Sequence, residues 1–353
     1  MGTINFVWWN LQNFFDTDDD PISKDFQYTA AHGWTTDVFA AKKANLAAAL
    51  NATHDGAGPD LLAVAEIEKD DLLAELIAEM GNPHLKVARD VSGTSDLRGI
   101  DVAVAYDDRK LRVIDLKSHL VHLRYRTRDI FEVDFEVLET GELLVVFGTH
   151  WPSRKLGKYR SAPLRIATAE HLAHLVEAHV KVAPETYEHL RAQDNIDPVR
   201  AKWETKVLIA GDLNDEPHDR SLLEHLRASG ELDRVIGETN DIDGFKKHTG
   251  DYRGQECFLF NATWKLLTQT ETGTYFMDSL FSGDKFSNRY QVIDQIIASR
   301  GLVSGQGLTL DLSSVQVFRD KLVATGSGRP RSFSKKRKTG TSDHLPVTAV
   351  LRY

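Results

Sequence analysis

Lys206-Val-Leu-Ile-Ala-Gly-Asp-Leu-Asn-Asp215 is a short apolar run that ends in polar residues. The run 207–210 predicts a buried strand, and Gly211 is expected to let the backbone turn at its end. Asp212 and Asn214 are two residues apart, so both side chains are expected to face one way. Such a pair suits hydrolysis, because the carboxylate can take a proton from water or bind a cation, and the carboxamide can fix that water or a phosphate oxygen. A strand followed by an ordinary Asx turn explains the same residues, so the rest of the chain has to decide.

The composition is that of a globular chain. It has 353 residues, of which 41% are hydrophobic and 27% charged, enough for one large α/β domain or two ordinary ones. No run approaches the roughly 20 apolar residues that a membrane span needs, and no signal peptide is visible, so we expect no stable membrane association. The lone Cys257 excludes an internal disulfide and a Cys/His zinc cluster, and a reducing cytoplasm is the expected compartment.

The charge is unevenly distributed. The formal net charge of −9 argues against a protein that coats nucleic acid by bulk attraction. Three windows without any acid, 122–128, 153–165 and 329–338, nevertheless carry 14 positive charges together. Charge runs are usually solvated loops, but two of these windows flank candidate catalytic residues. We therefore expect a basic rim around an acidic centre.

Hydrophobic periodicity predicts alternating helices and strands along most of the chain. His171, His174 and His179 in the predicted helix 161–182, at spacings of 3 and 5, form no His-x-x-x-His pair and are expected to be ordinary helix residues. No repeat or domain boundary is visible, so we expect a single domain over 1–353, with an insertion near 183–205 and an irregular segment at 230–290. The predicted helices are 37–50, 161–182 and 219–228, and the further predicted strands are 84–89, 100–106, 111–121 and 129–138.

Two strands in the first part of the chain end in polar residues. Residues 4–9 predict a strand that ends at Asn10, and residues 61–65 predict a buried strand that ends at Glu66. A structural turn explains Asn10, and acids at the start of a following helix suit its dipole. Glu66 is the better candidate for a metal ligand, because it comes directly off the apolar strand.

Histidines and acids stand at strand ends in the second part. Residues 143–148 predict a strand that leads to His150, and Asp343 and His344 precede the last strand. Asp294 interrupts an apolar strand, and a buried carboxylate needs a partner. It is therefore half of a structural ion pair or the group that orients a histidine.

Two arginines are candidates for substrate binding. Arg154 follows His150 in a basic window. Arg98 lies in a turn-rich loop, where it either pairs with Asp96 or Asp101 or contacts a substrate phosphate.

Taken in order, these positions resemble the endonuclease/exonuclease/phosphatase superfamily, which has the DNase I-like fold. The resemblance extends from about residue 4 to 351, and the segment Asn-Leu-Gln-Asn-Phe-Phe-Asp at 10–16 also resembles the opening of bacterial members. The matching positions are Asn10, Glu66, His150, Asp212-Leu213-Asn214, Asp294 and Ser342-Asp343-His344.

The resemblance implies an α/β four-layer sandwich, in which two packed, mainly antiparallel β-sheets are flanked by helices and the site lies at one end of the sheets. It also implies hydrolysis of a phosphoester with Mg²⁺ or Mn²⁺, for which Glu66 would be the principal ligand, helped by Asn10 and Asp343. Oxygen ligands of this kind suit Mg²⁺ independently of the resemblance.

The resemblance further implies roles for the remaining positions. Asp212 would activate or orient the attacking water, and Asn214 would hold that water and the phosphate. His150 and His344 would donate to phosphate oxygens or to the leaving group, and Asp294 would orient His344 as a carboxylate fixes an imidazole tautomer. Either Asp212 or His344 is the base.

Three functions remain open at this point. The first is a nuclease that cleaves DNA or RNA, favoured by the basic windows and by aromatic residues in 252–290 that can stack on bases. The second is a phosphatase or phosphodiesterase for a small molecule or a lipid headgroup. The third is a binding protein without catalysis, which the complete set of core residues disfavours.

Overall fold

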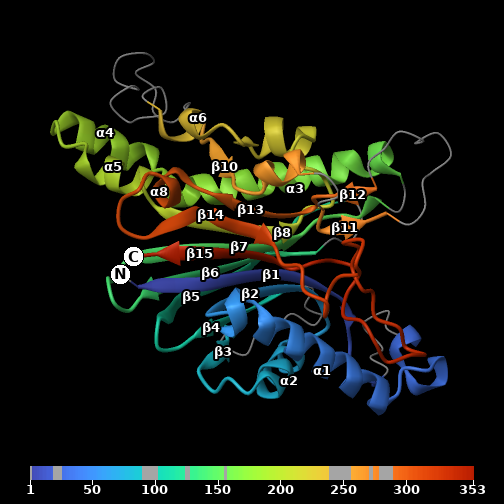
Figure 1. Cartoon of the computed structure of the whole chain (residues 1–353). Helices are drawn as coiled ribbons and strands as arrows, with labels where there is room; N and C mark the ends of the chain where they lie inside the picture. Colours follow the sequence, from blue (N-terminus) through green and yellow to red (C-terminus); the bar gives the residue numbers. More distant parts are fainter. Residues whose placement is uncertain are drawn as a thin grey trace.

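The apolar runs of the sequence form two mixed sheets that pack face to face, with helices on both outer sides (Figure 1). The predicted four-layer α/β sandwich is thereby confirmed. The structure is a computed structural model, and it describes residues 2–18, 26–89, 102–123, 128–154, 157–237, 256–269, 273–277 and 289–353.

The first sheet has the strand order β14-β15-β1-β2-β4-β3. Only β1 and β2 are parallel in it, and the other neighbours are antiparallel. The strands are β1 (Thr3–Phe14), β2 (Leu61–Ile67), β3 (Leu85–Val87), β4 (Val102–Asp107), β14 (Thr309–Val317) and β15 (Val347–Arg352).

The second sheet has the order β5-β6-β7-β8-β13-β10-β9, with β7–β8 and β10–β9 as its parallel pairs. A separate ribbon joins β11 (Tyr275–Phe276) and β12 (Tyr290–Gln291). The strands of the sheet are β5 (Leu111–His119), β6 (Ile130–Val137), β7 (Leu143–His150), β8 (Lys206–Asp212), β9 (Ala228–Ser229), β10 (Leu259–Asn261) and β13 (Asp294–Ala298).

Helices cover both outer faces. In Figure 1 helices α1 and α2 lie on the side of the first sheet, and α3 to α6 lie on the side of the second. Helices α4 and α5 occupy the stretch predicted to be an insertion, and the single-domain division stays a prediction. The helices are α1 (Thr36–Ala52), α2 (Asp70–Met80), α3 (Lys158–Val180), α4 (Pro184–Ala192), α5 (Asp197–Trp203), α6 (Leu232–Ile236) and α8 (Arg300–Val303), with shorter turns at Phe26–Tyr28, Ala30–His32, His54–Gly56 and Trp264–Thr268.

Strand alternation divides the core into layers. Along β1, Phe6 and Trp8 face the opposite sheet, whereas Val7 and Trp9 pack with the helices of the first sheet. The same alternation along β8 sends alternate residues to the centre and to α3. Because successive side chains of a strand point to opposite faces, a strand buried on both faces appears as a continuous apolar run. Both sheets are therefore fixed between two apolar layers, and the polar strand ends are left at the edge.

Gly211 does not make the turn that the sequence predicts. The strand β8 continues through it to Asp212, and Gly211 pairs with Gln295 of β13. A Cβ on Gly211 would lie 2.5 Å from the backbone oxygen of Thr149. Glycine is required here for the close approach of two strands, not for a left-handed backbone.

The helix predicted at 219–228 is wrong. Only Ser221–His225 is helical, as one π-type turn, and Arg227 takes a left-handed φ of 57°. Residues 228–229 then pair in parallel with Leu259 and Phe260. Tertiary pairing with a strand that lies thirty residues away in sequence overrides the local helical preference. Strand β14 was not predicted at all.

Candidate active site

Three of the candidate residues lie in one row across the second sheet. His150 is the register partner of Asp212 on the parallel strand β7, and Asp294 is the partner of Asp212 on the antiparallel strand β13. Cross-strand partners point to the same face of a sheet, so the three side chains are neighbours. The Nε2 atom of His150 lies 3.5 Å from Oδ2 of Asp212.

A histidine separates the two carboxylates of this row. The Nδ1 atom of His344 lies 2.7 Å from Oδ2 of Asp294, and its Nε2 atom lies 3.8 Å from Oδ2 of Asp212. The indole Nε1 of Trp8 donates to the other oxygen of Asp294 at 3.0 Å. Two carboxylates on adjacent strands would repel each other, and the imidazole between them offsets that repulsion.

The pKa values of Asp212 and His344 are both raised, but by different causes. Burial raises the pKa of the Asp212 carboxyl, and the charge of Asp294 raises it further, against the effect of the neighbouring histidines. Burial alone would lower the pKa of His344, but the charges of Asp294 and Asp212 outweigh it, so that its pKa lies well above the ordinary value. His344 is therefore held as a cation beside a buried carboxylate.

The loop before β15 is fixed to β1. The hydroxyl of Ser342 donates to the backbone oxygen of Asn10 at 2.6 Å and accepts from the backbone N–H of His344 at 3.1 Å. The indole of Trp9 donates to the backbone oxygen of His344 at 2.9 Å. The ring of Tyr275 packs against the imidazole, with centroids 4.9 Å apart. These contacts hold His344 at its position between the sheets.

Asp212 and Asn214 form an Asx turn at the end of β8. The backbone N–H of Asn214 donates to Oδ1 of Asp212 at 3.0 Å, and its carboxamide donates to the backbone oxygen of Trp151 at 3.1 Å. Asn214 takes a left-handed φ of 51°, which asparagine tolerates better than most residues. The turn and the candidate site are thus the same structure, and the two explanations of this stretch are not exclusive.

Asn10 connects the first sheet to the row. Its Nδ2 atom donates to Oδ2 of Asp212 at 3.1 Å, and its Oδ1 atom accepts from the backbone N–H of Gln12 at 2.9 Å. Asn10 is the register partner of Ala65 on the parallel strand β2, which places Glu66 next to it. Oxygen Oε2 of Glu66 accepts from the backbone N–H of Asn13 at 2.9 Å.

Asn10, Glu66 and Asp343, the residues predicted to bind metal, are together called the acidic pocket. Burial raises the pKa of Asp343, and the nearby charge of Glu66 raises it further, while the cations His344 and Lys42 act in the opposite sense. Two partly buried carboxylates next to a carboxamide oxygen fit a hard divalent cation such as Mg²⁺. Among the described residues, the Asp212–Asp294–His344 group also brings three potential ligand atoms within 4.8 Å of one another, but hydrogen bonds already use all three of these side chains.

Lys42 is a residue of this pocket that the sequence prediction missed. It is 1% exposed on α1, donates to the backbone oxygen of Gln12, and lies over the rings of Trp34 and Phe333. Burial lowers the pKa of its ammonium to about 7, although the charges of Asp343 and Glu66 raise it. The sequence does carry a signal, because a lysine follows Val38 at the four-residue spacing of the predicted buried stripe.

Tyr28 lies in the same electrostatic surroundings. Burial, followed by the charges of Glu66 and Asp343, raises the pKa of its phenol to about 12. The ammonium of Lys335, from the third basic window, lies 4.9 Å from the centre of this ring and donates to the backbone oxygen of Gln27 at 2.8 Å. The basic window 329–338 is therefore next to the acidic pocket.

The two arginine predictions have different outcomes. Arg98 lies outside the described residues, as do Arg124, Arg126 and Lys155 of the basic windows. Arg154 donates to the backbone oxygen of Asn214, and one of its Nη atoms lies 3.3 Å from Asp215 and 3.1 Å from Asp219. Substrate binding by Arg154 stays a prediction, and these bonds favour a role in holding the Asn214 turn.

The chain resembles a known protein family in sequence and several solved structures in fold. The sequence model of the Endonuclease/Exonuclease/phosphatase family matches residues 4–353. Members of this superfamily are phosphoester hydrolases. No curated protein matches the chain significantly. Among the described residues, no helix is long and apolar enough to span a bilayer.

Several solved structures share the fold over their whole length. TDP2 of D. rerio, complexed with a single-strand DNA product, is 12% identical with a TM-score of 0.54, and the match covers 100% of both chains. The mannosyl-6-phosphatase Bt3783 of Bacteroides thetaiotaomicron VPI-5482 is 14% identical with a TM-score of 0.52, covering 99% of this chain and 100% of the other. The human Nocturnin catalytic domain with bound sulfate is 13% identical with a TM-score of 0.50, covering 99% and 94%. At these identities the likeness is one of fold.

Proposed function

Because the chain belongs to the endonuclease/exonuclease/phosphatase family, we propose that it is a divalent-metal-dependent phosphoester hydrolase that cleaves phosphodiester bonds of DNA or RNA. The observation that carries the proposal is the row of His150, Asp212 and Asp294, closed by His344. It sets a buried carboxylate between two imidazoles, next to an acidic pocket.

This arrangement supplies the groups that phosphoester hydrolysis needs. An anionic phosphate repels an attacking oxygen, so positive charge and hydrogen-bond donors are required at its non-bridging oxygens. His344, held as a cation by Asp294, provides one such donor, and His150 provides another from the opposite side of Asp212. Asp212 is oriented by Asn10 and Asn214, so that it is placed to accept a proton from water.

Glu66, Asn10 and Asp343 are the residues that would hold the metal. A bound Mg²⁺ or Mn²⁺ would polarise a phosphoryl oxygen. The hydrogen bond from Asn13 to Glu66 leaves the second oxygen of this carboxylate available as a ligand. Gln12, which receives the Lys42 ammonium at its backbone oxygen, fixes the oxygen of Asn10 through its own N–H.

The basic window favours a polyanionic substrate. Lys336 and Arg337 make no side-chain hydrogen bond or ion pair with other described residues, and they flank Lys335, which lies beside the acidic pocket. Exposed cations next to a phosphoryl site suit the backbone of a nucleic acid. A small phosphoester is the second candidate, favoured by the net charge of −9, which opposes binding of a long polyanion away from this rim.

The first experiment tests hydrolysis. Turnover of plasmid DNA, single-stranded DNA, RNA, inositol phosphates, sphingomyelin and a chromogenic diester is measured with Mg²⁺, with Mn²⁺ and with chelator. We expect metal-dependent cleavage by the wild type, and a loss of at least about 100-fold in Glu66→Gln and in Asp212→Asn. Wild-type activity in either folded variant would remove that residue from the mechanism, and activity in chelator would refute metal dependence.

The second experiment separates nuclease from small-molecule activity. A Lys336→Ala/Arg337→Ala variant is expected to raise KM for long DNA or RNA and to leave KM for the chromogenic diester unchanged, because only the polymer reaches the rim. Arg191→Ala/Lys202→Ala is the matched control, because it also removes two cations but from helices away from the candidate site. Helices α4 and α5 lie at the opposite end of the molecule from the β11–β12 ribbon (Figure 1). Equal effects on both substrates would favour the small phosphoester.

A further inference from the structure

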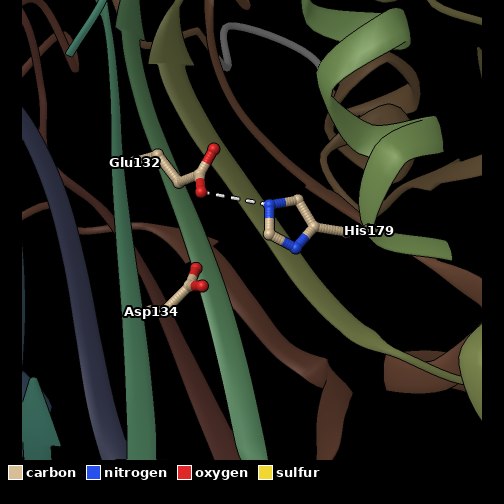
Figure 2. Close-up of side chains that lie close together, drawn as sticks. All are labelled: Glu132, Asp134 and His179. Carbon is tan, nitrogen blue, oxygen red and sulfur yellow. Dashed lines mark hydrogen bonds and ion pairs between the residues drawn. The ribbon is translucent and has the colours of Figure 1, made fainter. Parts of the chain in front are cut away.

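A second cluster of metal-ligand side chains lies on the outer face of the second sheet. Glu132 and Asp134 are two residues apart on β6, so both point to the face that α3 covers. His179 from the last turn of α3 meets them there, with Nε2 3.1 Å from Oε1 of Glu132. Figure 2 shows both carboxylates on the same side of the strand, facing the imidazole. One ligand atom from each of the three lies within 4.8 Å of the others.

Asp134 lacks a partner in this cluster. Its side chain is buried, with 9% exposure, and its Oδ1 atom makes no hydrogen bond with any described residue. A buried oxygen of a carboxylate without a donor is destabilising, and native proteins rarely retain one. Burial raises the pKa of this carboxyl, and the charge of Glu132 raises it further, against the effect of His179. Oδ1 of Asp134 is therefore the atom of the cluster that needs a hydrogen-bond donor or a cation.

His119 holds the second oxygen of Glu132. It ends strand β5, and its Nε2 atom lies 2.7 Å from Oε2 of Glu132. The ring of Phe147 packs against the imidazoles of both His119 and His179, with centroids 6.5 and 5.7 Å away, and forms an apolar wall. One imidazole and two carboxylates thus converge beside an apolar surface, and His119 fixes one of the carboxylates.

One cation already contacts the cluster. Lys117 lies 3.3 Å from Oε1 of Glu132 and 2.6 Å from Asp115, and its side chain is 47% exposed. An exposed ammonium that pairs with a surface acid can move away at little cost. Lys117 does not hydrogen-bond to Oδ1 of Asp134, so this oxygen still lacks a hydrogen-bond donor among the described residues.

We propose that Glu132, Asp134 and His179 bind one divalent transition-metal ion of the Zn²⁺ class, with His119 as a positioning residue that holds Glu132. Imidazole nitrogens with carboxylate oxygens are ligands that select zinc, whereas magnesium selects oxygen alone. Ligand atoms at the usual zinc distances are about 3.4 Å apart in a tetrahedron, so the Glu132–His179 pair at 3.1 Å has to open slightly and the other pairs, within 4.8 Å, have to close. The ion would satisfy Oδ1 of Asp134.

The site would fasten the end of α3 to the edge of the sheet. At its other end, the same helix carries Arg165, whose Nε lies 2.8 Å from Asp215 in the turn that holds Asn214. The cluster differs from the Glu66–Asp343 pocket in its donors and belongs to other strands. Its metal is therefore structural, and its occupancy can be measured without reference to hydrolysis.

The test is a titration of metal-free protein with Co²⁺, followed by visible absorption. It is done in the Glu66→Gln background, so that the pocket of the active site contributes less. We expect about one equivalent of Co²⁺ with the strong bands of four-coordinate cobalt, displaced by Zn²⁺ and not by excess Mg²⁺. Because changes outside the ligand set already cost about 10–100-fold in affinity, loss of a ligand in Asp134→Asn or His179→Gln is expected to cost at least about 100-fold.

Two controls match these variants. His174→Gln lies on the exposed face of α3, and Asp197→Asn is an exposed acid on α5, so both should bind Co²⁺ as the parent does. Thermal unfolding provides the second measurement, because Asp134→Asn removes the unsatisfied charge and should fold in metal-free form. In the Glu66→Gln background, Zn²⁺ is expected to raise the unfolding temperature of the parent and not that of the variant that also carries Asp134→Asn. Four-coordinate bands that persist in both ligand variants, or their absence in the parent, would overturn the proposal.

Discussion

Replacement of Asp294 by asparagine tests whether the Asp294 carboxylate holds His344 as a cation in the candidate active site. Asp294 is fully buried and accepts from Trp8 at 3.0 Å and from His344 at 2.7 Å. In Asp294→Asn, the amide oxygen can turn to the indole N–H and keep that bond. The amide NH₂ then faces Nδ1 of His344, which has to become an acceptor. His344 is thereby expected to be neutral, with its proton on Nε2.

The magnitude follows from the bond that is lost. A hydrogen bond to a charged group contributes about 1.5–3 kcal/mol, so the unfolding equilibrium should shift by about 10–150-fold in metal-free protein. The folded-state pKa of His344 is raised above its ordinary value, so its contribution is fully present below the unfolded pKa and is lost as the pH rises through the folded one. The difference between wild type and Asp294→Asn should therefore be largest near pH 6 and should narrow at alkaline pH.

Denaturant unfolding at several pH values, in chelator, measures this difference, and kcat/KM on the best substrate should fall by about 10²–10⁴-fold because the cationic donor is lost. Asp311→Asn is the matched control, since Asp311 pairs with Arg352 at the surface and the pair contributes at most about 1 kcal/mol. A pH-independent stability loss, or activity within threefold of wild type, would refute the assignment of His344 as a cation held by Asp294.

Two further variants test the packing and the charge around the site. Gly211→Ala should lower the free energy of unfolding by about 1–3 kcal/mol, because its Cβ would lie 2.5 Å from the backbone oxygen of Thr149, whereas Gly326→Ala, with open space at its Cβ, should change it little. If Gly211→Ala and Gly326→Ala had equal denaturation midpoints, the two strands would be able to move apart at no cost, and the prediction would be wrong. Lys42→Met should remove a pH dependence of stability. The folded-state pKa of Lys42, about 7, lies below the ordinary lysine pKa of 10.5, so the unfolded chain binds more protons between these values and wild-type stability rises with pH there. Urea unfolding near pH 7 and near pH 10 measures the rise, which Lys43→Met should keep, and an undiminished rise in Lys42→Met would contradict the assignment.

The sequence alone determined the strands and the types of residue at their ends. Runs such as 61–65 and 207–210 are apolar because both faces of these strands are buried, and that property is local. The order of Asn10, Glu66, His150 and the later polar residues along the chain was sufficient to indicate the family, which the match over residues 4–353 confirms. Fold class and chemical class were therefore accessible without a structure.

Only the tertiary structure decided which side chains meet. The register that sets His150 and Asp294 on either side of Asp212 depends on strands from distant parts of the chain, and no local pattern specifies it. The burial of Lys42 and the strand at 228–229 have the same origin, since both result from packing against segments remote in sequence. The three helix histidines show this most clearly: their spacing indicated no site, yet His179 meets Glu132 because a helix and a strand separated by 47 residues share one face of the sheet.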